Sequence, residues 1–240
     1  MRWGTVQYAP GKRPLLPGLR RTAGTALLAA CVATGLAAFL AGRGSPGRLD
    51  TAIDPRIAAA LSRFPALLNW LPDIGTLGPV ALMTLVLALA CVATRRWSGA
   101  VLAVVAVPGA SALTEYLLKP YVGVLLGQSF PSGHATSMFA LAAVCSVLLA
   151  DPPGRRVPGA VRLLLMLMAL LLAAAVAAAM VAIGAHVFTD AVAGAAVGTG
   201  VVLACALTLD LSASRARRAP AGQSESAGLP ACELVSAEMW

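Results

Sequence analysis

Six apolar stretches of membrane-spanning length constrain this chain more than any other feature of its sequence. They cover residues 22–42, 74–94, 98–118, 134–150, 163–185 and 186–209. A helix needs ~20 apolar residues to cross the hydrocarbon core of a bilayer, and each stretch is close to that length. Only 12% of the 240 residues are charged, against about 25% in a soluble domain. The pattern predicts an all-α fold, a polytopic membrane helix bundle with about six transmembrane helices.

The distribution of positive charge predicts how the bundle is oriented. With a cytoplasmic N-terminus, thirteen of the eighteen Lys and Arg residues fall in cytoplasmic segments, as the positive-inside rule requires. We therefore expect an integral protein of the plasma membrane with both termini in the cytoplasm. The expected parts are a basic N-terminal tail (1–21), the membrane domain (22–209) and a polar, disordered cytoplasmic tail (210–240). A cleaved signal peptide is the alternative for the first stretch, which is longer than the apolar core of a usual signal peptide.

Composition and spacing argue against several other classes of protein. The positive charges lie in short connections without a basic patch interleaved with aromatic residues, so no nucleic-acid partner is predicted. The five cysteines lack metal-ligand spacing and are interpreted as small apolar residues without disulfides. The mixed segment 43–73 predicts an exported loop with a short helix along the membrane interface. Gly194 and Gly198 fit the small-xxx-small pattern of close helix packing.

The chain has only two histidines, and both stand at the start of an apolar stretch. His134 follows Phe-Pro-Ser-Gly at residues 130–133, and His186 lies in Gly-Ala-His-Val-Phe-Thr-Asp at residues 184–190. Imidazole changes protonation near neutral pH and serves as nucleophile, acid or base. The predicted orientation puts both on the extracytoplasmic face, and ionisable groups at membrane depth are costly and usually functional. The other polar residues expected on this face are Glu115, Lys119, Gln128, Ser129, Ser132, Thr189 and Asp190.

Three local spacings on this face each allow a functional and a structural interpretation. Asp190 lies one helical turn after His186, where its carboxylate can orient the imidazole or merely stabilise a helix end. Ser132 is placed to cap the fourth helix, whose first amides can face an anion or simply begin the helix. Lys119 can supply charge to a phosphate, or Glu115, four residues earlier, can neutralise it.

Together these features resemble the type 2 phosphatidic acid phosphatase (PAP2) superfamily, which also contains the vanadium haloperoxidases. The family pattern is Lys, six residues, Arg-Pro; then Pro-Ser-Gly-His; then Ser-Arg, five residues, His, three residues, Asp. Residues 131–134 match the second part in full, and Lys119 matches the start of the first. His186 and Asp190 match the end of the third. The resemblance covers residues 70 to 210 and implies a PAP2-type core and an integral-membrane, bacterial-type lipid phosphatase.

Both phosphate-binding arginines of the family pattern are missing from this chain. The first would fall at Leu126, with Gly127 in place of the proline, or at Val124 with a shorter spacing. No arginine occurs from residue 97 to residue 154, and the Ser-Arg pair of the third part is replaced by Ala179 and Met180. Arg is the preferred bidentate phosphate ligand, so its loss removes donors that stabilise a phosphoryl-transfer transition state.

The resemblance implies a role for each matching residue. His186 would attack phosphorus and form a phosphohistidine, Asp190 would orient it, and His134 would protonate the leaving alkoxide. No metal or other cofactor is implied, in keeping with a sequence without a carboxylate or cysteine cluster. The residues implied to hold the phosphoryl oxygens are Lys119, Ser132 and the Gly133 amide, with Gln128, Ser129 and Glu115 as auxiliary candidates.

The predicted function is a membrane phosphatase that hydrolyses a lipid phosphate or pyrophosphate, phosphatidate-like or polyprenyl diphosphate-like, on the extracytoplasmic face. The missing arginines keep open a second interpretation, a weak or inactive PAP2-fold protein that binds or carries lipid phosphates. An unrelated transporter or structural bundle is a third. The intact histidines favour the first, because a decayed site loses its nucleophile as readily as its phosphate clamp. The sequence predicts no particular oligomeric state.

Overall fold

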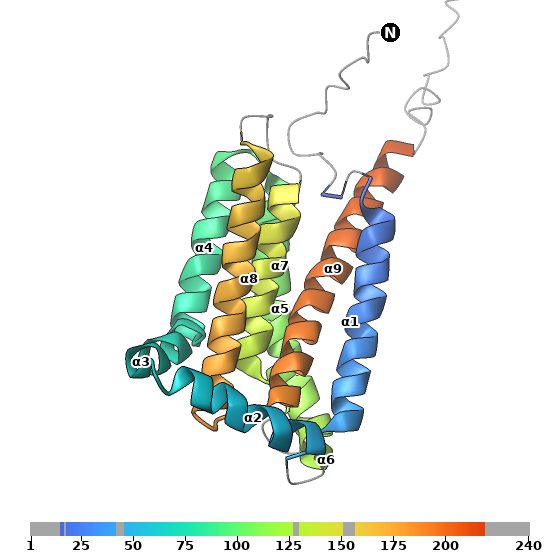
Figure 1. The fold of residues 1–240 in the computed structure, drawn as a ribbon. Helices are drawn as coiled ribbons and strands as arrows, with labels where there is room; N and C mark the ends of the chain where they lie inside the picture. The colour runs from blue at the N-terminus through green and yellow to red at the C-terminus, as the bar shows by residue number, and fades with distance from the viewer. Residues whose placement is uncertain (1–14, 17, 42–45, 127–129, 151–156, 219–240) are drawn as a thin grey trace, which may run out of the picture.

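The computed structural model describes residues 15–16, 18–41, 46–126, 130–150 and 157–218 of the chain. All regular elements within these ranges are helices, and the long ones stand side by side in one bundle (Figure 1). In chain order they are α1 (Arg20–Leu40), α2 (Arg48–Leu61), α3 (Pro65–Ile74), α4 (Leu77–Ala93), α5 (Trp97–Ala112), the π-helix η1 (Leu113–Gly123), α6 (Val124–Leu126), α7 (Gly133–Ala150), α8 (Gly159–Ala182) and α9 (Phe188–Arg218).

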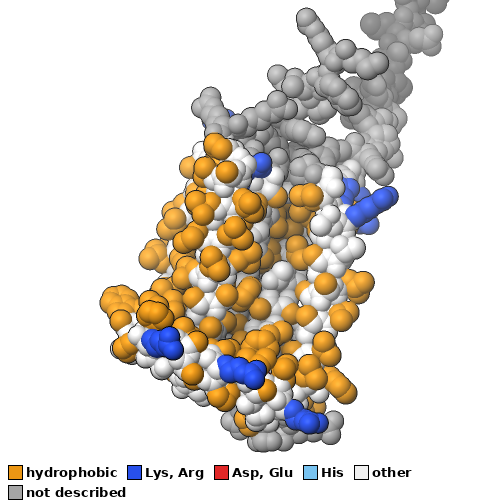
Figure 2. All heavy atoms as spheres, viewed as in Figure 1, with side chains coloured by type: hydrophobic (Ala, Val, Ile, Leu, Met, Phe, Trp, Pro, Cys, Tyr) orange, Lys and Arg blue, Asp and Glu red, His pale blue; other side chains and the backbone are white. Residues whose placement is uncertain are grey.

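Length and hydrophobicity make this bundle suited to a membrane. Within the described ranges, five helices are long and apolar enough to cross a bilayer, and six if the bent α3–α4 pair is one broken span. Hydrophobic side chains cover most of the visible outer face of the helices (Figure 2). Such a large exposed apolar surface is stable in lipid rather than in water. The predicted all-α membrane helix bundle is confirmed.

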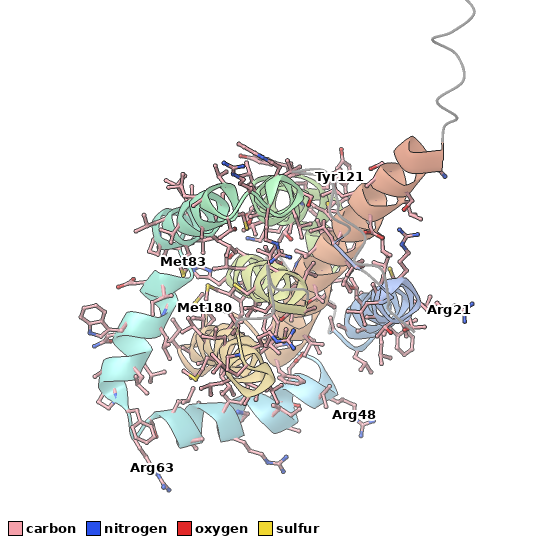
Figure 3. All side chains as sticks on the ribbon, turned by 90° about the horizontal axis from the view of Figure 1, so that it is seen from above. Arg21, Arg48, Arg63, Met83, Tyr121 and Met180 are labelled. Atoms are coloured by element: carbon pink, nitrogen blue, oxygen red, sulfur yellow. The ribbon has the colours of Figure 1, made fainter. Side chains whose placement is uncertain are left out.

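The helices differ in how much of their circumference is buried. α7 lies at the centre of the bundle and packs against α5, α8 and α9 (Figure 3). Its apolar residues are spread all round the axis, as expected for a helix enclosed by others. α1 packs along α9, and only every seventh residue of α1 is buried: Ala23, Ala30 and Ala37. The remaining faces of α1 are free to contact lipid.

The connection after the third predicted span differs from the prediction. The apolar stretches 98–118 and 134–150 predict a loop over residues 119–133 between them, but the chain stays helical to Leu126. Pro120 and Gly123 suggest a helix end in the sequence, because proline lacks the amide that an α-helix needs and glycine favours other conformations. The wider π turns of η1, with i→i+5 hydrogen bonds, run through both residues. Glu115 and Lys119 therefore project from successive helical turns.

The last helix also extends further than predicted. α9 continues to Arg218 instead of ending at residue 209. Asp210, expected at the start of a disordered tail, is only 1% exposed. Its carboxylate accepts a hydrogen bond from the Leu15 amide at 2.9 Å and another from the Arg20 guanidinium. These contacts hold the extra turns of α9 against the start of α1. The rest of the predicted tail, from residue 219, lies outside the described residues, as do residues 1–14.

Two short helices, α2 and α3, lie across one end of the bundle, where a single interfacial helix was predicted (Figure 1). We call this the α2–α3 end. The side chains of Arg48 and Arg63 point away from the bundle there (Figure 3). Asp50, on the same helix as Arg48, is fully buried. α2 therefore has a basic outer face and an acidic inner face, and the inner face meets the residues considered next.

Candidate active site

The start of α7 is held in place by its own cap and by α9. The Ser132 hydroxyl accepts a hydrogen bond from the Ala135 amide at 3.4 Å, so the predicted helix cap is confirmed. The Ser132 amide in turn donates to the backbone carbonyl of Asp190 at 3.0 Å. His134, on the first turn of α7, is thereby tied to the first turn of α9.

Two glycines of α9 make this close approach possible. A Cβ atom added to Gly194 would lie 2.4 Å from the Ser132 carbonyl oxygen, and one added to Gly198 would lie 2.2 Å from the Thr136 carbonyl oxygen. Both distances are far below van der Waals contact, and backbone atoms cannot move aside as a flexible side chain can. The predicted small-xxx-small packing is confirmed, and it lies between α9 and the helix that carries His134.

His186 lies in the tight turn between α8 and α9. Gly184 has a φ of +73°, the left-handed conformation that commonly ends a helix. The amides of Ala185 and His186 both donate to the Met180 carbonyl, at 3.1 and 3.2 Å. His186 Nδ1 lies 3.4 Å from Asp190 Oδ2, and the two side chains are 10% and 4% exposed. The four-residue spacing thus brings the carboxylate to the imidazole as predicted, at a slightly long hydrogen-bond distance, although the helix begins at Phe188 and not at His186 as we predicted.

The first amides of α9 are capped by carboxylates of α2. Asp54 Oδ1 accepts from the Phe188 amide at 3.0 Å, and Asp50 Oδ1 accepts from the Thr189 amide at 2.9 Å. The Thr189 hydroxyl also donates to Asp50, at 3.0 Å. Burial raises the pKa of Asp54; the Phe188 amide opposes this rise, and the nearby negative charges of Asp50 and Asp190 add to it.

Sequence reasoning missed this contact. The sequence predicts the segment that carries Asp50 and Asp54 only as an exported loop with an interfacial helix. The available signal was that the two acids stand four residues apart, which places them on one face of a helix. Nothing in the local sequence, however, says which amides such a face would meet.

A cavity of about 760 Å³ opens beside the two histidines. Five residues with polar or small groups line it near the α2–α3 end: Glu115, Lys119, Gly133, His134 and His186. Further along, its walls come from α4 and α5 and are mostly apolar: Val80, Thr84, Leu85, Val104, Val107 and Ser111. Leu85 and Val104 are each 54% exposed, so the cavity opens sideways between α4 and α5 onto the outer face of the bundle.

Lys119 and Glu115 form an ion pair inside this cavity. Lys119 Nζ lies 2.7 and 2.8 Å from the two carboxylate oxygens of Glu115. The carboxylate also packs against Gly133, where an added Cβ would lie 2.4 Å from Oε1. The cation predicted to bind phosphate is therefore present in the cavity, but its charge is balanced by a neighbouring carboxylate.

His134 is held at the bend between α3 and α4. A Cβ atom added to Gly75 would lie 2.8 Å from both His134 Cδ2 and Val176 Cγ1. The bend of 62° at this glycine thus leaves only enough space for the imidazole edge. The sequence offered no sign that this glycine contacts His134.

The structure therefore gathers most, but not all, of the predicted site residues. Asp190 lies behind His186 and away from the cavity, and Ser132 is buried as the cap of α7 rather than among the cavity-lining residues. Thr189 is also buried, on Asp50. Gln128 and Ser129 lie outside the described residues.

The two positions where the family pattern has arginine carry no substitute donor. Leu126 is partly buried against Phe130 and its neighbours, and Val124, the alternative position, is 74% exposed. Met180 is buried in the bundle (Figure 3). No arginine is found among the described residues that line the cavity.

Comparison with known families agrees with this arrangement. The sequence model of the PAP2 superfamily matches residues 22–212, which include both histidines, Asp190 and Lys119. No curated protein and no solved structure gave a significant match. The match spans most of the chain, and so this protein is a member of the PAP2 superfamily.

Proposed function

We propose that the protein is a membrane phosphatase that removes phosphate from a lipid phosphate or pyrophosphate through a phosphohistidine intermediate. Membership of the PAP2 superfamily supports a phosphatase-type enzyme with a phosphorylated substrate. The observation that carries the proposal is one cavity lined by both histidines, one of which has a carboxylate at its Nδ1 atom. From the charge distribution we further propose that this cavity faces the extracytoplasmic side of the plasma membrane and that both termini are cytoplasmic.

In the first step, His186 is the nucleophile. Asp190 accepts the hydrogen on Nδ1, which leaves the lone pair of Nε2 free to attack phosphorus. The P–N bond forms as the P–O bond to the lipid breaks, and protonated His134 gives its proton to the departing oxygen. The products are a lipid alcohol, or a lipid monophosphate from a diphosphate, and phosphohistidine at residue 186.

In the second step, water resolves the intermediate. The water oxygen attacks phosphorus while neutral His134 accepts a proton from that water. The P–N bond breaks, and its electron pair returns to Nε2 of His186. Inorganic phosphate leaves and both histidines regain their starting states. Lys119 and the Gly133 amide bind the phosphoryl oxygens in both steps, and Ser132 supports them as the cap of α7.

The shape of the cavity supports a lipid substrate. Its polar end holds the histidines, whereas its α4–α5 walls are apolar and open sideways to the outer face. A phosphorylated headgroup suits the first region and a hydrocarbon chain suits the second. A chain that enters sideways need never leave the bilayer, so the headgroup alone has to be desolvated.

A second candidate function rests on the charge of the polar end. Lys119 is paired with Glu115, and no arginine is found among the described residues that line the cavity. Phosphoryl transfer depends on neutralising the developing charge, so these features favour slow turnover or binding without turnover. On this view the protein binds or carries lipid phosphates.

One assay separates the two functions. Detergent-purified protein is incubated with phosphatidate, phosphatidylglycerophosphate or polyprenyl diphosphate in the presence of a chelator, and released phosphate is measured beside His186→Ala. We expect release that disappears in the variant while its melting temperature stays near that of the wild type. Undiminished release by His186→Ala would remove this histidine as the nucleophile. Saturable binding of a lipid phosphate with no release by the wild type would establish the second function.

A further inference from the structure

The start of α9 lacks a cap of its own. The residue before Phe188 is Val187, whose side chain has no oxygen to accept a hydrogen bond from the first amides. Asp54 and Asp50 supply those acceptors from a helix more than 130 positions earlier in the chain, at 3.0 and 2.9 Å. Asp50 Oδ2 also accepts from the amide of Gly47 at 3.0 Å, so both oxygens of this buried carboxylate are hydrogen bonded.

This cap is unusual in its charge. With Asp190, three carboxylates surround the first turn of one helix. Within the part of the chain that the structure describes, no Lys or Arg pairs with Asp50 or Asp54, and no three His, Cys, Asp or Glu side chains are arranged to hold a metal ion. Among the described residues, the charge of the two α2 carboxylates is compensated by hydrogen bonds from the Phe188, Thr189 and Gly47 amides and the Thr189 hydroxyl, and by the dipole of α9. Asp50 is fully buried and Asp54 partly buried, which is costly for carboxylates, and simple docking of α2 could use apolar contacts instead.

The same helical turn is held from the opposite side by α7. The Ser132 amide donates to the Asp190 carbonyl, while Asp50 binds the amide of the preceding residue, Thr189. One further turn along α2, Ile57 packs against Ala135, Ala177, Val181 and Ala191, which lie on α7, α8 and α9. The inner face of α2 therefore lies over the point where these three helices meet.

We propose that Asp50 and Asp54 are positioning residues, which hold the first turn of α9 so that Asp190 stays aligned with Nδ1 of His186. This inference rests on the proposed function, because it assigns α2 a part in orienting the nucleophile. Since Asp190 directly follows the two capped amides, any rotation of that turn changes the 3.4 Å contact between the carboxylate and the imidazole. A misplacement of about 1 Å costs on the order of 10²-fold in rate.

The two histidines allow a test that does not depend on turnover. Protein labelled with ¹⁵N-histidine has two imidazoles to observe by NMR, and His186→Ala assigns them. We expect His186 to carry its hydrogen on Nδ1 in the wild type and to lose that preference in Asp190→Asn. Asp54→Ala should shift the His186 signals toward those of Asp190→Asn. Asp54→Asn keeps the single acceptor atom that binds Phe188 and should retain the wild-type signals.

Arg56→Ala is the matched control, because Arg56 lies on the exposed outer face of α2. Its His186 signals should equal those of the wild type. In the phosphate-release assay, Asp54→Ala should lower kcat by about 10²-fold with KM unchanged, and Asp54→Asn should restore it. Asp50→Ala should act in the same direction; if that variant does not fold, the two Asp54 variants decide.

Folded Asp54→Ala with wild-type His186 signals would overturn the inference, as would equal losses in Asp54→Ala and Asp54→Asn. Failure of the proposed function gives a different result. In that case no variant and no wild-type protein releases phosphate, while the NMR signals still report whether α2 orients His186.

Discussion

The α7–α9 contact and the α4–α5 contact show opposite ways of packing two helices in one bundle. Between α7 and α9, glycines bring the backbones so close that a single methyl group would collide with carbonyl oxygens. Between α4 and α5, apolar side chains leave a cavity of about 760 Å³ that opens onto the outer face. All four helices are rich in alanine and larger aliphatic residues, so hydrophobicity alone does not distinguish the two contacts.

The two contacts differ in what they offer the site: the α7–α9 contact fixes side chains in place, and the α4–α5 contact leaves open space. The α7–α9 contact joins the helix of His134 to the helix of Asp190, and rigid backbone contact keeps such groups in alignment. The α4–α5 contact carries no proposed catalytic group, and under the proposed function its cavity takes the lipid chain. Under the proposed function, the close α7–α9 contact keeps the site rigid and the α4–α5 cavity admits the substrate.

The largest effect is expected from Gly198→Ala, which disrupts the tight contact. The new methyl group would meet the Thr136 carbonyl oxygen at 2.2 Å, so α7 and α9 must separate. Overpacking of this kind costs about 1–3 kcal/mol of stability, and we expect phosphate release to fall with it. Thermal unfolding in detergent and the release assay measure both.

Gly200→Ala is the control on the same helix. Its added Cβ would lie 3.5 Å from Ala30 Cβ, an ordinary contact. We expect unchanged activity and equal or slightly higher stability, because alanine is the better helix former. Equal losses of stability and phosphate release in Gly198→Ala and Gly200→Ala would show that these properties do not depend on the close approach of α7 and α9.

The next largest effect is expected from a substitution at Gly75, where the bend between α3 and α4 meets His134. Gly75→Ala places a methyl group 2.8 Å from the His134 ring, which must then shift. We expect kcat to fall by about 10²-fold with a smaller change in stability. Gly78→Ala, three residues later, has open space for its methyl group and should behave as the wild type. A fully active Gly75→Ala protein would contradict a role for His134 in its observed position.

A moderate effect is expected from filling the cavity between α4 and α5. Ser111→Phe adds a ring to the α5 wall of the cavity. We expect KM for long-chain lipid phosphates to rise about tenfold, equivalent to about 1.4 kcal/mol, with little change for a short-chain phosphate. Val105→Phe faces outward from the same helix, at 55% exposure, and should change neither value. Equal effects on long and short chains would argue against a chain-binding role.

The smallest effect is expected in the pH dependence of stability, through Asp54 of α2, which caps α9 beside the α7–α9 contact. The pKa of Asp54 is raised in the folded protein, so the folded state holds this proton more strongly than the unfolded chain, where the value is 3.8. The resulting stabilisation is complete below pH 3.8 and is lost as the pH rises through the folded-state pKa. Asp54→Asn removes the titration and keeps the Phe188 hydrogen bond.

We therefore expect the melting temperature of Asp54→Asn, relative to the wild type, to increase as the pH rises from about 3.8 and then to level off. The measurement is thermal unfolding in detergent at a series of pH values. Asp73→Asn, an exposed acid on α3, serves as the control. A difference that stays constant with pH would contradict the raised pKa of Asp54.

Local sequence patterns predicted those features that depend on neighbours along the chain. The apolar stretches predicted the bundle, and the i, i+4 spacing predicted the contact of His186 with Asp190. Ser132 predicted the cap of α7. Each of these depends on residues only a few positions apart or on the length of one apolar stretch, which the order of residues determines directly.

Tertiary structure alone decided how these helices meet. It placed Asp50 and Asp54 on the start of α9, set Gly75 against His134, and opened the cavity between α4 and α5. It also carried helical structure through Pro120, where local signals favoured a break. Such contacts join residues far apart in the chain, and their free energy depends on shape and on unsatisfied amides that no single segment contains. The sequence by itself therefore determined the helices and the pairing of His186 with Asp190, whereas the mutual positions of the helices depend on packing between them.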